Sequence, residues 1–159
     1  NHHLFLSEYI QRLKDQYIQN WRTSCLDKSK LKHYVGFKQD VITEKYLFVI
    51  DIAKFRACLV NFRSSAHCLM IEKGRHHSIS SEFRTYCEWC IEDEFHFILV
   101  CSLYNNLRDK YISDTYAKHP SVDKFYRLMS SIDTDSIRNL AMYIYYAFKE
   151  RNAYLEIFS

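Results

Sequence analysis

The stretch CEWCIEDEFHFILVC, residues 87–101, organises the middle of the chain. It holds three cysteines and a histidine at the spacing C-x2-C-x5-H-x4-C, namely Cys87, Cys90, His96 and Cys101. Two thiols separated by two residues lie on one tight turn, and a His and a Cys separated by four residues converge at the end of a short helix. The spacing therefore predicts that these four side chains bind one metal ion.

Thiolate and imidazole ligands favour Zn²⁺ over Mg²⁺ or Ca²⁺. Four protein ligands complete a tetrahedron and leave no position for a substrate, so we expect a structural zinc site. The central gap of five residues is short, like that of a zinc knuckle and unlike the gap of twelve in a C2H2 finger. The alternative interpretation is that the cysteines are buried thiols and His96 is an ordinary core histidine, because free cysteine is among the most buried residue types.

The composition favours helices around this segment. The chain of 159 residues has 13 Tyr and 11 Phe but only two Gly and one Pro, too few turn-forming residues for many tight hairpins. Its length is typical of one domain. We therefore expect a mainly α fold: a single helical domain over residues 1–159, with about six to seven helices and a CCHC zinc-knuckle-like segment at residues 84–108.

In the first half of the chain, apolar residues recur at helical spacing and predict an amphipathic helix over residues 3–24. Its stripe is expected to face the core and consists of Leu6, Tyr9, Ile10, Leu13, Tyr17 and Trp21. A short helix is expected over residues 30–35. A second long helix is expected over residues 43–63, and because it is apolar nearly all round we place it at the centre of the fold.

Around the cysteine pair, Gly74 is expected to end a short segment in the left-handed conformation. Residues 91–100 are expected to form the helix that carries the histidine. The acids Glu92, Asp93 and Glu94 lie in its first turn, where carboxylates complement the helix dipole. We prefer this interpretation to a catalytic one, because nothing nearby supplies a nucleophile and base.

Three further helices are expected after the cysteine segment. Ser102 is predicted to cap a helix over residues 103–116, with Leu103, Leu107 and Tyr111 turned inward. A short helix follows over residues 122–129. The segment from Asp133 to Ser136 then caps a last helix over residues 136–155.

The net charge of +3 does not by itself indicate a nucleic-acid-binding protein. The distribution of charge is more informative, because six cations and only three acids lie between residues 51 and 86. These cations are Lys54, Arg56, Arg63, Lys73, Arg75 and Arg84. The chain has no apolar run long enough to span a membrane and no secretory signal, so we expect an intracellular protein of the nucleus or cytoplasm with reduced or metal-bound thiols. Because it begins with Asn1, it is also a candidate fragment of a longer protein.

The order of residues resembles the region that follows the reverse transcriptase domain in invertebrate non-LTR retrotransposon polyproteins. The specific part of the resemblance is Phe62-Arg63…His67…Gly74-Arg75, Arg84-x-x-Cys87-x-x-Cys90, and Ile91-Glu92-Asp93-Glu94-x-His96-Phe97-x-x-x-Cys101-x-x-Tyr104-x-x-Leu107-Arg108. Weaker matches extend it to nearly the whole chain, at Asp15-Gln16-Tyr-x-Gln19-x-Trp21 and Leu140-Ala-x-Tyr143-Ile144-x-x-Ala147-x-x-x-Arg151.

The resemblance implies a zinc-binding segment that helps a reverse transcriptase hold its RNA or its target DNA. Members of that family usually have several more residues between the second cysteine and the histidine. The polymerase core and its Tyr-x-Asp-Asp motif are absent here. The resemblance thus implies an accessory domain of a larger polyprotein, or a copy of that domain with another use.

Two functions remain open at this point. In the first, the chain is a zinc-stabilised accessory nucleic-acid-binding domain of a retroelement protein: the six cations contact phosphates of RNA or DNA, and Trp89 stacks on an unpaired base. In the second, it is a structural or protein-interaction module with zinc only as a scaffold clip, Trp89 packs beneath the zinc loop and the cations form a solvated face.

We expect no enzyme activity and no small-molecule substrate. Four protein ligands leave no site for a metal-bound water, and the His-x-Glu signature of zinc deaminases is missing.

Overall fold

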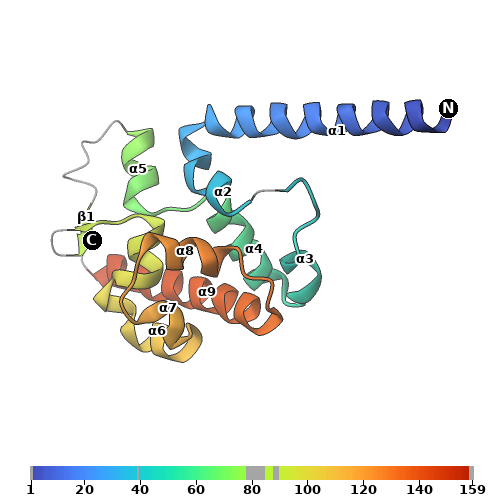
Figure 1. Cartoon of the computed structure of the whole chain (residues 1–159). Helices are drawn as coiled ribbons and strands as arrows, with labels where there is room; N and C mark the ends of the chain where they lie inside the picture. Colours follow the sequence, from blue (N-terminus) through green and yellow to red (C-terminus); the bar gives the residue numbers. More distant parts are fainter. Residues whose placement is uncertain (1, 39, 78–84, 88–89, 158–159) are drawn as a thin grey trace. The chain divides into compact units, whose positions relative to one another are not determined.

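The computed structural model of the protein describes residues 2–38, 40–77, 85–87 and 90–157, with the backbone alone for residues 2, 3, 32, 85, 86, 90 and 157 (Figure 1). Contacts divide the chain into two compact units, residues 1–42 and residues 43–159. The single domain expected over residues 1–159 thus contains two internal contact units.

The mainly α fold predicted from the sequence is confirmed. The described residues form nine α-helices, α1 to α9, together with short 3-10 and π-helical turns and one small β-hairpin. The helices are more numerous than the six or seven expected. One reason is that two of the predicted helices are each divided in two.

The first unit consists of α1 (His2–Leu26), the 3-10 turn η1 (Ser29–Leu31) and α2 (Lys32–Phe37). Helices were predicted over residues 3–24 and 30–35, and both are confirmed. The chain turns back after Leu26, so that the ring of Tyr34 meets the ring of Trp21 edge-on, with 6.3 Å between the centroids. An edge-on contact of this kind stabilises the pairing of α1 and α2.

The prediction that the apolar stripe of α1 faces the core is wrong. Tyr17 is 61% exposed and Leu6 is 52% exposed, and Tyr9, Ile10 and Leu13 are exposed as well. Only the end of the stripe is partly covered, at Trp21. The amphipathic pattern therefore forms a helix as predicted, but within the first unit η1 and α2 pack only on its last turns.

In the second unit, α9 (Thr134–Ile157) packs against α3 (Tyr46–Val49), α4 (Ala53–Arg63) and α6 (Asn105–Tyr111) (Figure 1). The predicted helix over residues 136–155 is confirmed. The predicted cap is present too, because Asp133 Oδ2 accepts a hydrogen bond from the backbone N–H of Ser136 at 2.8 Å. The inward face of α9 is buried completely at Tyr143, Ile144 and Ala147.

Helix α8 (Val122–Met129) has the bounds that the sequence predicts. Ser121 caps it by accepting a hydrogen bond from the N–H of Lys124 at 3.2 Å. Phe125 on this helix is fully buried. A capping serine followed by an amphipathic run is a local signal, which is why the bounds are correct.

The predicted helix over residues 43–63 is wrong, because the chain opens between α3 and α4 at residues 50–52. Two arginine side chains donate hydrogen bonds to backbone carbonyl groups at this opening. Arg138 Nε donates to the Val49 carbonyl at 2.8 Å, and Arg56 Nη1 donates to the Ile50 carbonyl at 2.6 Å. Phe48 is consequently 72% exposed, and the first part of this segment lies at the surface and not at the centre.

Two further predictions about helix ends are wrong. Gly74 lies inside α5 (Met70–His76) with a negative φ, so it is not a left-handed cap. The helix expected over residues 103–116 is divided into the turn η4 (Ser102–Tyr104), α6 and α7 (Asp114–Ala117). Ser113 caps α7 by accepting from the N–H of Thr115, and Leu103 is exposed rather than inward.

Candidate metal centre

A short β-hairpin carries the first part of the Cys/His motif. Strands β1 (Thr85–Cys87) and β2 (Cys90–Ile91) pair antiparallel, with the backbone of Cys87 opposite that of Cys90. The tight turn expected for this pair of cysteines thus has paired strands on either side. Trp89 and Arg84 lie outside the described residues, and so does the side chain of Cys90.

The second part of the motif is a π-helical turn, η3 (His96–Val100), where a helix was expected over residues 91–100. Its hydrogen bond runs from the N–H of Cys101 to the carbonyl of His96, at 2.8 Å. In an α-helix two residues five apart point about 140° away from each other. A π turn is closed by a bond between residues five apart and brings them to one side. The π geometry is therefore what lets His96 and Cys101 converge.

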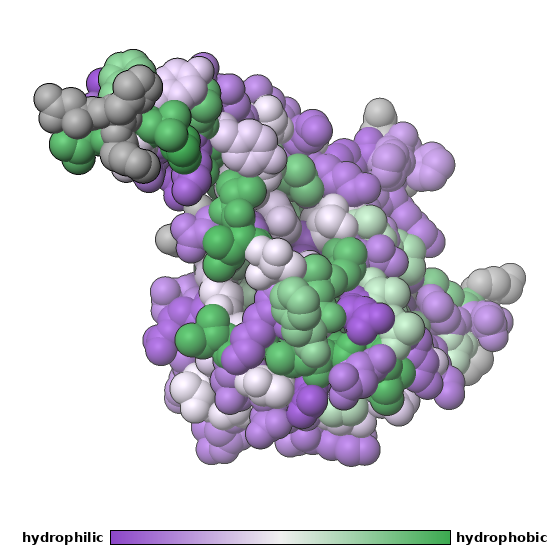
Figure 2. All heavy atoms as spheres, turned by 90° about the vertical axis from the view of Figure 1, so that its right-hand side faces the viewer, coloured by the Kyte–Doolittle hydropathy of each residue, from purple (hydrophilic) through white to green (hydrophobic). Residues whose placement is uncertain are grey.

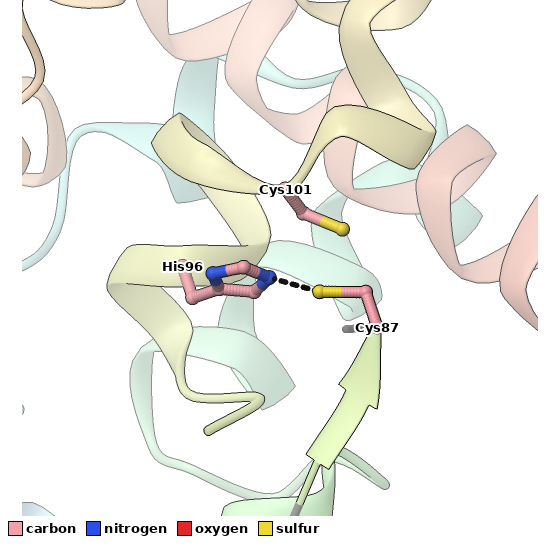
Figure 3. Close-up of side chains that lie close together, drawn as sticks. All are labelled: Cys87, His96 and Cys101. Carbon is pink, nitrogen blue, oxygen red and sulfur yellow. Dashed lines mark hydrogen bonds between the residues drawn. The ribbon is translucent and has the colours of Figure 1, made fainter. Parts of the chain in front are cut away.

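Three candidate ligands of the motif, all within the described residues, converge on one point (Figure 3). His96 Nε2 and Cys87 Sγ are 2.9 Å apart, and all three candidate ligand atoms, including Cys101 Sγ, lie within 4.8 Å of one another. His96 and Cys101 are buried and Cys87 is partly buried. Among the described residues, Cys87, His96 and Cys101 thus form a group that could hold a metal ion.

Burial changes the proton affinity of two of these ligands. It lowers the pKa of His96, although the nearby carboxylates of Asp93 and Glu92 oppose this change. It raises the pKa of the Cys101 thiol to about 12, with a further increase from Cys87 beside it. At neutral pH the metal-free site therefore contains a neutral imidazole, ready to act as a ligand, and a protonated Cys101 thiol.

Two long polar side chains hold the backbone of the π turn from behind. Arg108 on α6 donates to the carbonyl groups of Ile98 and Cys101, at 2.9 and 2.7 Å. Tyr143 on α9 donates its hydroxyl to the carbonyl of Phe97 at 2.7 Å. Both side chains are buried. The carbonyl groups that a π turn leaves without regular partners are thus satisfied, and the ligands are attached to the core of the second unit.

A buried ion pair anchors the chain between the hairpin and the π turn. Arg151 Nε and Nη2 donate to the two carboxylate oxygens of Glu92, at 2.6 and 2.7 Å. The N–H of Met70, at the start of α5, donates to Glu92 as well, at 2.7 Å. Glu92 therefore joins α5 and α9 just before the ligand-bearing turn.

A second buried carboxylate lies two residues further on. Glu94 Oε1 accepts from the hydroxyl of Ser65 at 2.9 Å and from His67 Nε2 at 3.0 Å. Since a carboxylate can only accept, the proton of this contact belongs to the imidazole. The ring of His67 also lies against Phe62, with 5.2 Å between the centroids. Glu94 thus ties the ligand-bearing turn to the segment that follows α4.

The prediction that the acids of residues 92–94 merely complement a helix dipole is wrong for two of the three. Asp93 does cap the turn, because its Oδ1 accepts from the N–H of His96 at 2.8 Å. Glu92 and Glu94 are buried and act as anchors. The alternating burial of residues 91–96 was not visible in the charge pattern, and Arg151, Arg108 and Tyr143 were missed as supports of the site. Their inclusion in the motifs quoted above was the only signal.

The cations that were expected to contact nucleic acid differ in their burial and in their partners. Arg63 is buried, and its guanidinium donates hydrogen bonds to the Met129 carbonyl and to Glu44. Its assignment as a phosphate contact is therefore wrong. Lys54 and Lys73 are exposed. Arg56 is partly buried and donates to the Ile50 carbonyl, and Arg75 is partly exposed and paired with Glu72.

No helix in the described parts of the chain combines the length and apolar character needed to cross a membrane. Comparison with family models, with curated proteins and with solved structures gives no match to this chain.

Proposed function

We propose that the metal is Zn²⁺ and that the chain is a zinc-stabilised accessory nucleic-acid-binding domain of a retroelement protein. The observation that carries the proposal is the convergence of Cys87, His96 and Cys101 from two separate elements. A set of two thiols and an imidazole suits zinc far better than magnesium or calcium. The group is largely buried and therefore leaves little room for the water ligands that magnesium and calcium retain.

The spacing of the ligand atoms supports zinc binding. Zn–S and Zn–N bonds of about 2.3 and 2.0 Å at tetrahedral angles place a sulfur and a nitrogen ligand about 3.5 Å apart. Cys87 Sγ and His96 Nε2 are 2.9 Å apart. The distance between these two atoms would have to increase by less than about 1 Å to admit the ion. Rotation of the partly buried Cys87 side chain accommodates this change.

Cys90 is our candidate for the fourth ligand. The antiparallel pairing of its backbone with Cys87 keeps the two cysteines of the motif together at the hairpin. Four protein ligands would close the coordination sphere, so the role proposed for zinc is to stabilise the fold and not to activate water. The proposed function is therefore binding and not catalysis.

Contact with nucleic acid is proposed from the exposed cations and from the resemblance. Lys54 and Lys73 are exposed, and Arg75 is partly exposed at the end of α5. Arg84 and Trp89 belong to the proposal because of their place in the motif. The first three would neutralise phosphates, and Trp89 would stack on an unpaired base of RNA or DNA.

Metal content measured by mass spectrometry of the purified chain is the first test. We expect one zinc per chain, lost in Cys87→Ser, His96→Ala and Cys101→Ser and retained in Cys25→Ser and Cys58→Ser. A folded wild-type chain without metal would contradict the zinc proposal. Titration of labelled single-stranded RNA and DNA at two salt concentrations then tests nucleic-acid binding, which should weaken steeply as salt is added.

A protein-interaction module with zinc only as a clip is the second candidate. Exposed apolar side chains favour it: Phe48 is 72% exposed and Ile132 is 78% exposed, and Leu47 and Ile52 are exposed as well. Figure 2 shows apolar side chains, coloured green, at the surface of the face that corresponds to the right-hand side of Figure 1. Binding of a partner that persists in high salt, with no salt-dependent binding of RNA or DNA, would decide for this candidate.

A further inference from the structure

Two cysteines of the candidate metal centre also suit a second chemistry. Cys87 and Cys101 are free thiols, and their Sγ atoms lie at most 4.8 Å apart. One is at the end of β1 and the other just after the π turn η3, and Figure 3 shows both side chains pointing toward the same region. We propose that Cys87 and Cys101 are a redox pair, which an oxidant of the peroxide class joins in a disulfide, so that metal binding at this site is sensitive to oxidation.

The distance between the two sulfur atoms permits a disulfide within the present fold. A disulfide bond is about 2.05 Å long, so the sulfur atoms must approach each other by less than about 3 Å. Rotation about one Cα–Cβ bond, from one staggered position to the next, moves a cysteine sulfur by about 3 Å. Because Cys87 is only partly buried, we expect its side chain to rotate while Cys101 stays in place beside the buried π turn.

The backbone of the hairpin disfavours the competing pair of Cys87 and Cys90. Cys90 lies directly opposite Cys87 in the antiparallel pairing of β1 and β2. Opposite residues in such a pair have Cβ atoms about 4.5–5.5 Å apart. A disulfide needs about 3.5–4.5 Å between the Cβ atoms, so a bond at this position would strain the hairpin. Cys101 approaches from a separate element and is therefore the better partner.

The different burial of the two thiols assigns the order of the reaction. Cys87 is partly buried and can be reached by a small oxidant, whereas Cys101 is 2% exposed. Peroxide therefore transfers one oxygen atom to the sulfur of Cys87, which becomes a sulfenic acid while water is released. Cys87 is thus the residue that the oxidant attacks, and Cys101 is the resolving thiol.

The second step forms the disulfide. The sulfur of Cys101 attacks the sulfur of Cys87, the S–O bond breaks, and the hydroxide leaves with the proton of the Cys101 thiol as a second water. Two thiols and one peroxide thus give one disulfide and two waters. This step is the slower one, because burial raises the pKa of the Cys101 thiol to about 12 and the thiolate is the attacking form.

The disulfide and the metal exclude each other. Zinc binds thiolates, and a disulfide sulfur has no negative charge to offer it. After oxidation only His96 and the proposed ligand Cys90 remain, too few for a closed site. The new bond still links β1 to the π turn, so we expect the helices of the second unit to persist. Release of zinc rests on the proposed function, whereas formation of the disulfide in the metal-free chain does not.

Peptide mapping of the metal-free chain tests the pairing. Cleavage after Lys, Arg and Glu places each of the six cysteines in a peptide of its own, because Glu88 and Glu92 divide the motif. The chain is treated with about one equivalent of hydrogen peroxide and analysed by mass spectrometry without reduction. We expect the peptide of residues 85–88 to be linked to that of residues 95–108. A link from residues 85–88 to residues 89–92, or a folded chain without the expected link, overturns the proposal.

Two variants give matched controls. Cys90→Ser should still form the expected link, because Cys90 takes no part in the disulfide. Cys101→Ser should leave the sulfenic acid on Cys87, where dimedone traps it. Circular dichroism checks that each chain is folded. Loss of the link in a folded Cys90→Ser chain contradicts the pairing of Cys87 with Cys101.

Release of zinc is measured separately. In the zinc-loaded chain, peroxide should release one zinc for each disulfide formed, which a chromophoric chelator detects, and dithiothreitol should restore metal binding. Retention of zinc by a chain that has formed the disulfide contradicts the sensitivity of metal binding to oxidation. A chain that forms the disulfide but never binds zinc supports the redox pair and contradicts the proposed metal instead.

Discussion

Arg151, near the C-terminal end of α9, binds both carboxylate oxygens of Glu92 across fifty-nine residues of sequence, and each side chain is at most 2% exposed. The pair closes the second unit around the ligand-bearing turn. Both charges are shielded from solvent, so the attraction between them offsets the free energy that each loses in hydration. The energetic consequence of this arrangement can be tested.

We expect Arg151→Met to lower the free energy of unfolding by about 3–5 kcal/mol, because it leaves the carboxylate of Glu92 buried without its cation. Urea denaturation followed by circular dichroism measures this loss. Adding Glu92→Gln to Arg151→Met should restore part of it, since no isolated charge then remains. The matched control is Arg127→Met on the exposed face of α8, which should change the stability by less than about 0.5 kcal/mol.

The hydrogen bonds of Arg108 to the π turn predict an effect on metal binding without loss of a ligand. In Arg108→Met the carbonyl groups of Ile98 and Cys101 lose their donors, and the orientation of both ligands of the turn relaxes. We expect zinc affinity to fall by about 10- to 100-fold, as for other residues that support metal ligands. Competition with a chromophoric chelator measures it. Lys110→Met, which removes the same charge from the exposed face of α6, should not change the affinity.

The protonation of Cys101 predicts that zinc binding strengthens as pH rises. Burial raises the pKa of this thiol to about 12, so at pH 6 to 8 it must release a proton when it binds zinc. Each thiol that releases a proton makes the apparent affinity rise about tenfold per pH unit. The pKa of His96 is lowered, so this imidazole is already neutral at pH 7 and its protonation competes only in more acidic solution.

Calorimetric titration of zinc in two buffers of different ionisation enthalpy counts the protons released. We expect at least one proton to be released per zinc at pH 7. An apparent affinity that does not change between pH 6 and pH 8 would contradict protonated thiols in the metal-free site.

The exposure of Lys73 predicts a salt-dependent contribution to nucleic-acid binding. In Lys73→Gln the plot of log affinity against log salt concentration should be less steep than in the wild type, with a slope smaller in magnitude by about one, because one phosphate contact is lost. Fluorescence anisotropy of a labelled oligonucleotide gives this slope. Lys149→Gln, an exposed cation of α9, serves as the control and should leave the slope unchanged. Equal slopes for Lys73→Gln and the wild type would remove Lys73 from the proposed interface.

Local signals in the sequence were sufficient for two of the helices that begin with a capping side chain, α8 and α9. Ser121 and Asp133 mark the starts of α8 and α9, and both helices were predicted correctly. The opening between α3 and α4 was missed because its cause is distant: Arg138 reaches the carbonyl of Val49 across eighty-nine residues. Hydrophobic periodicity contains no information about such a contact.

Three of the four candidate ligand positions, Cys87, His96 and Cys101, could be predicted from spacing alone, whereas the supports of the site could not. His96 and Cys101 were expected on one helix, and their convergence depends on a π turn that spacing does not distinguish from an α-helix. Arg63 shows the opposite limit. It lies among exposed cations in the sequence and was grouped with them, although its guanidinium is buried against the Met129 carbonyl.

The π turn also makes the site sensitive to the length of the chain. Deleting one residue between His96 and Cys101 would leave the two side chains four apart, about 40° from each other on a regular α-helix, whereas inserting one residue would place them six apart and about 120° from each other. Substitution of Ile98 by another apolar residue would leave the register intact. In a library that combines apolar substitutions with single-residue insertions, we would therefore expect metal binding to tolerate the substitutions at residues 97–100 and to be lost when one residue is inserted between His96 and Cys101.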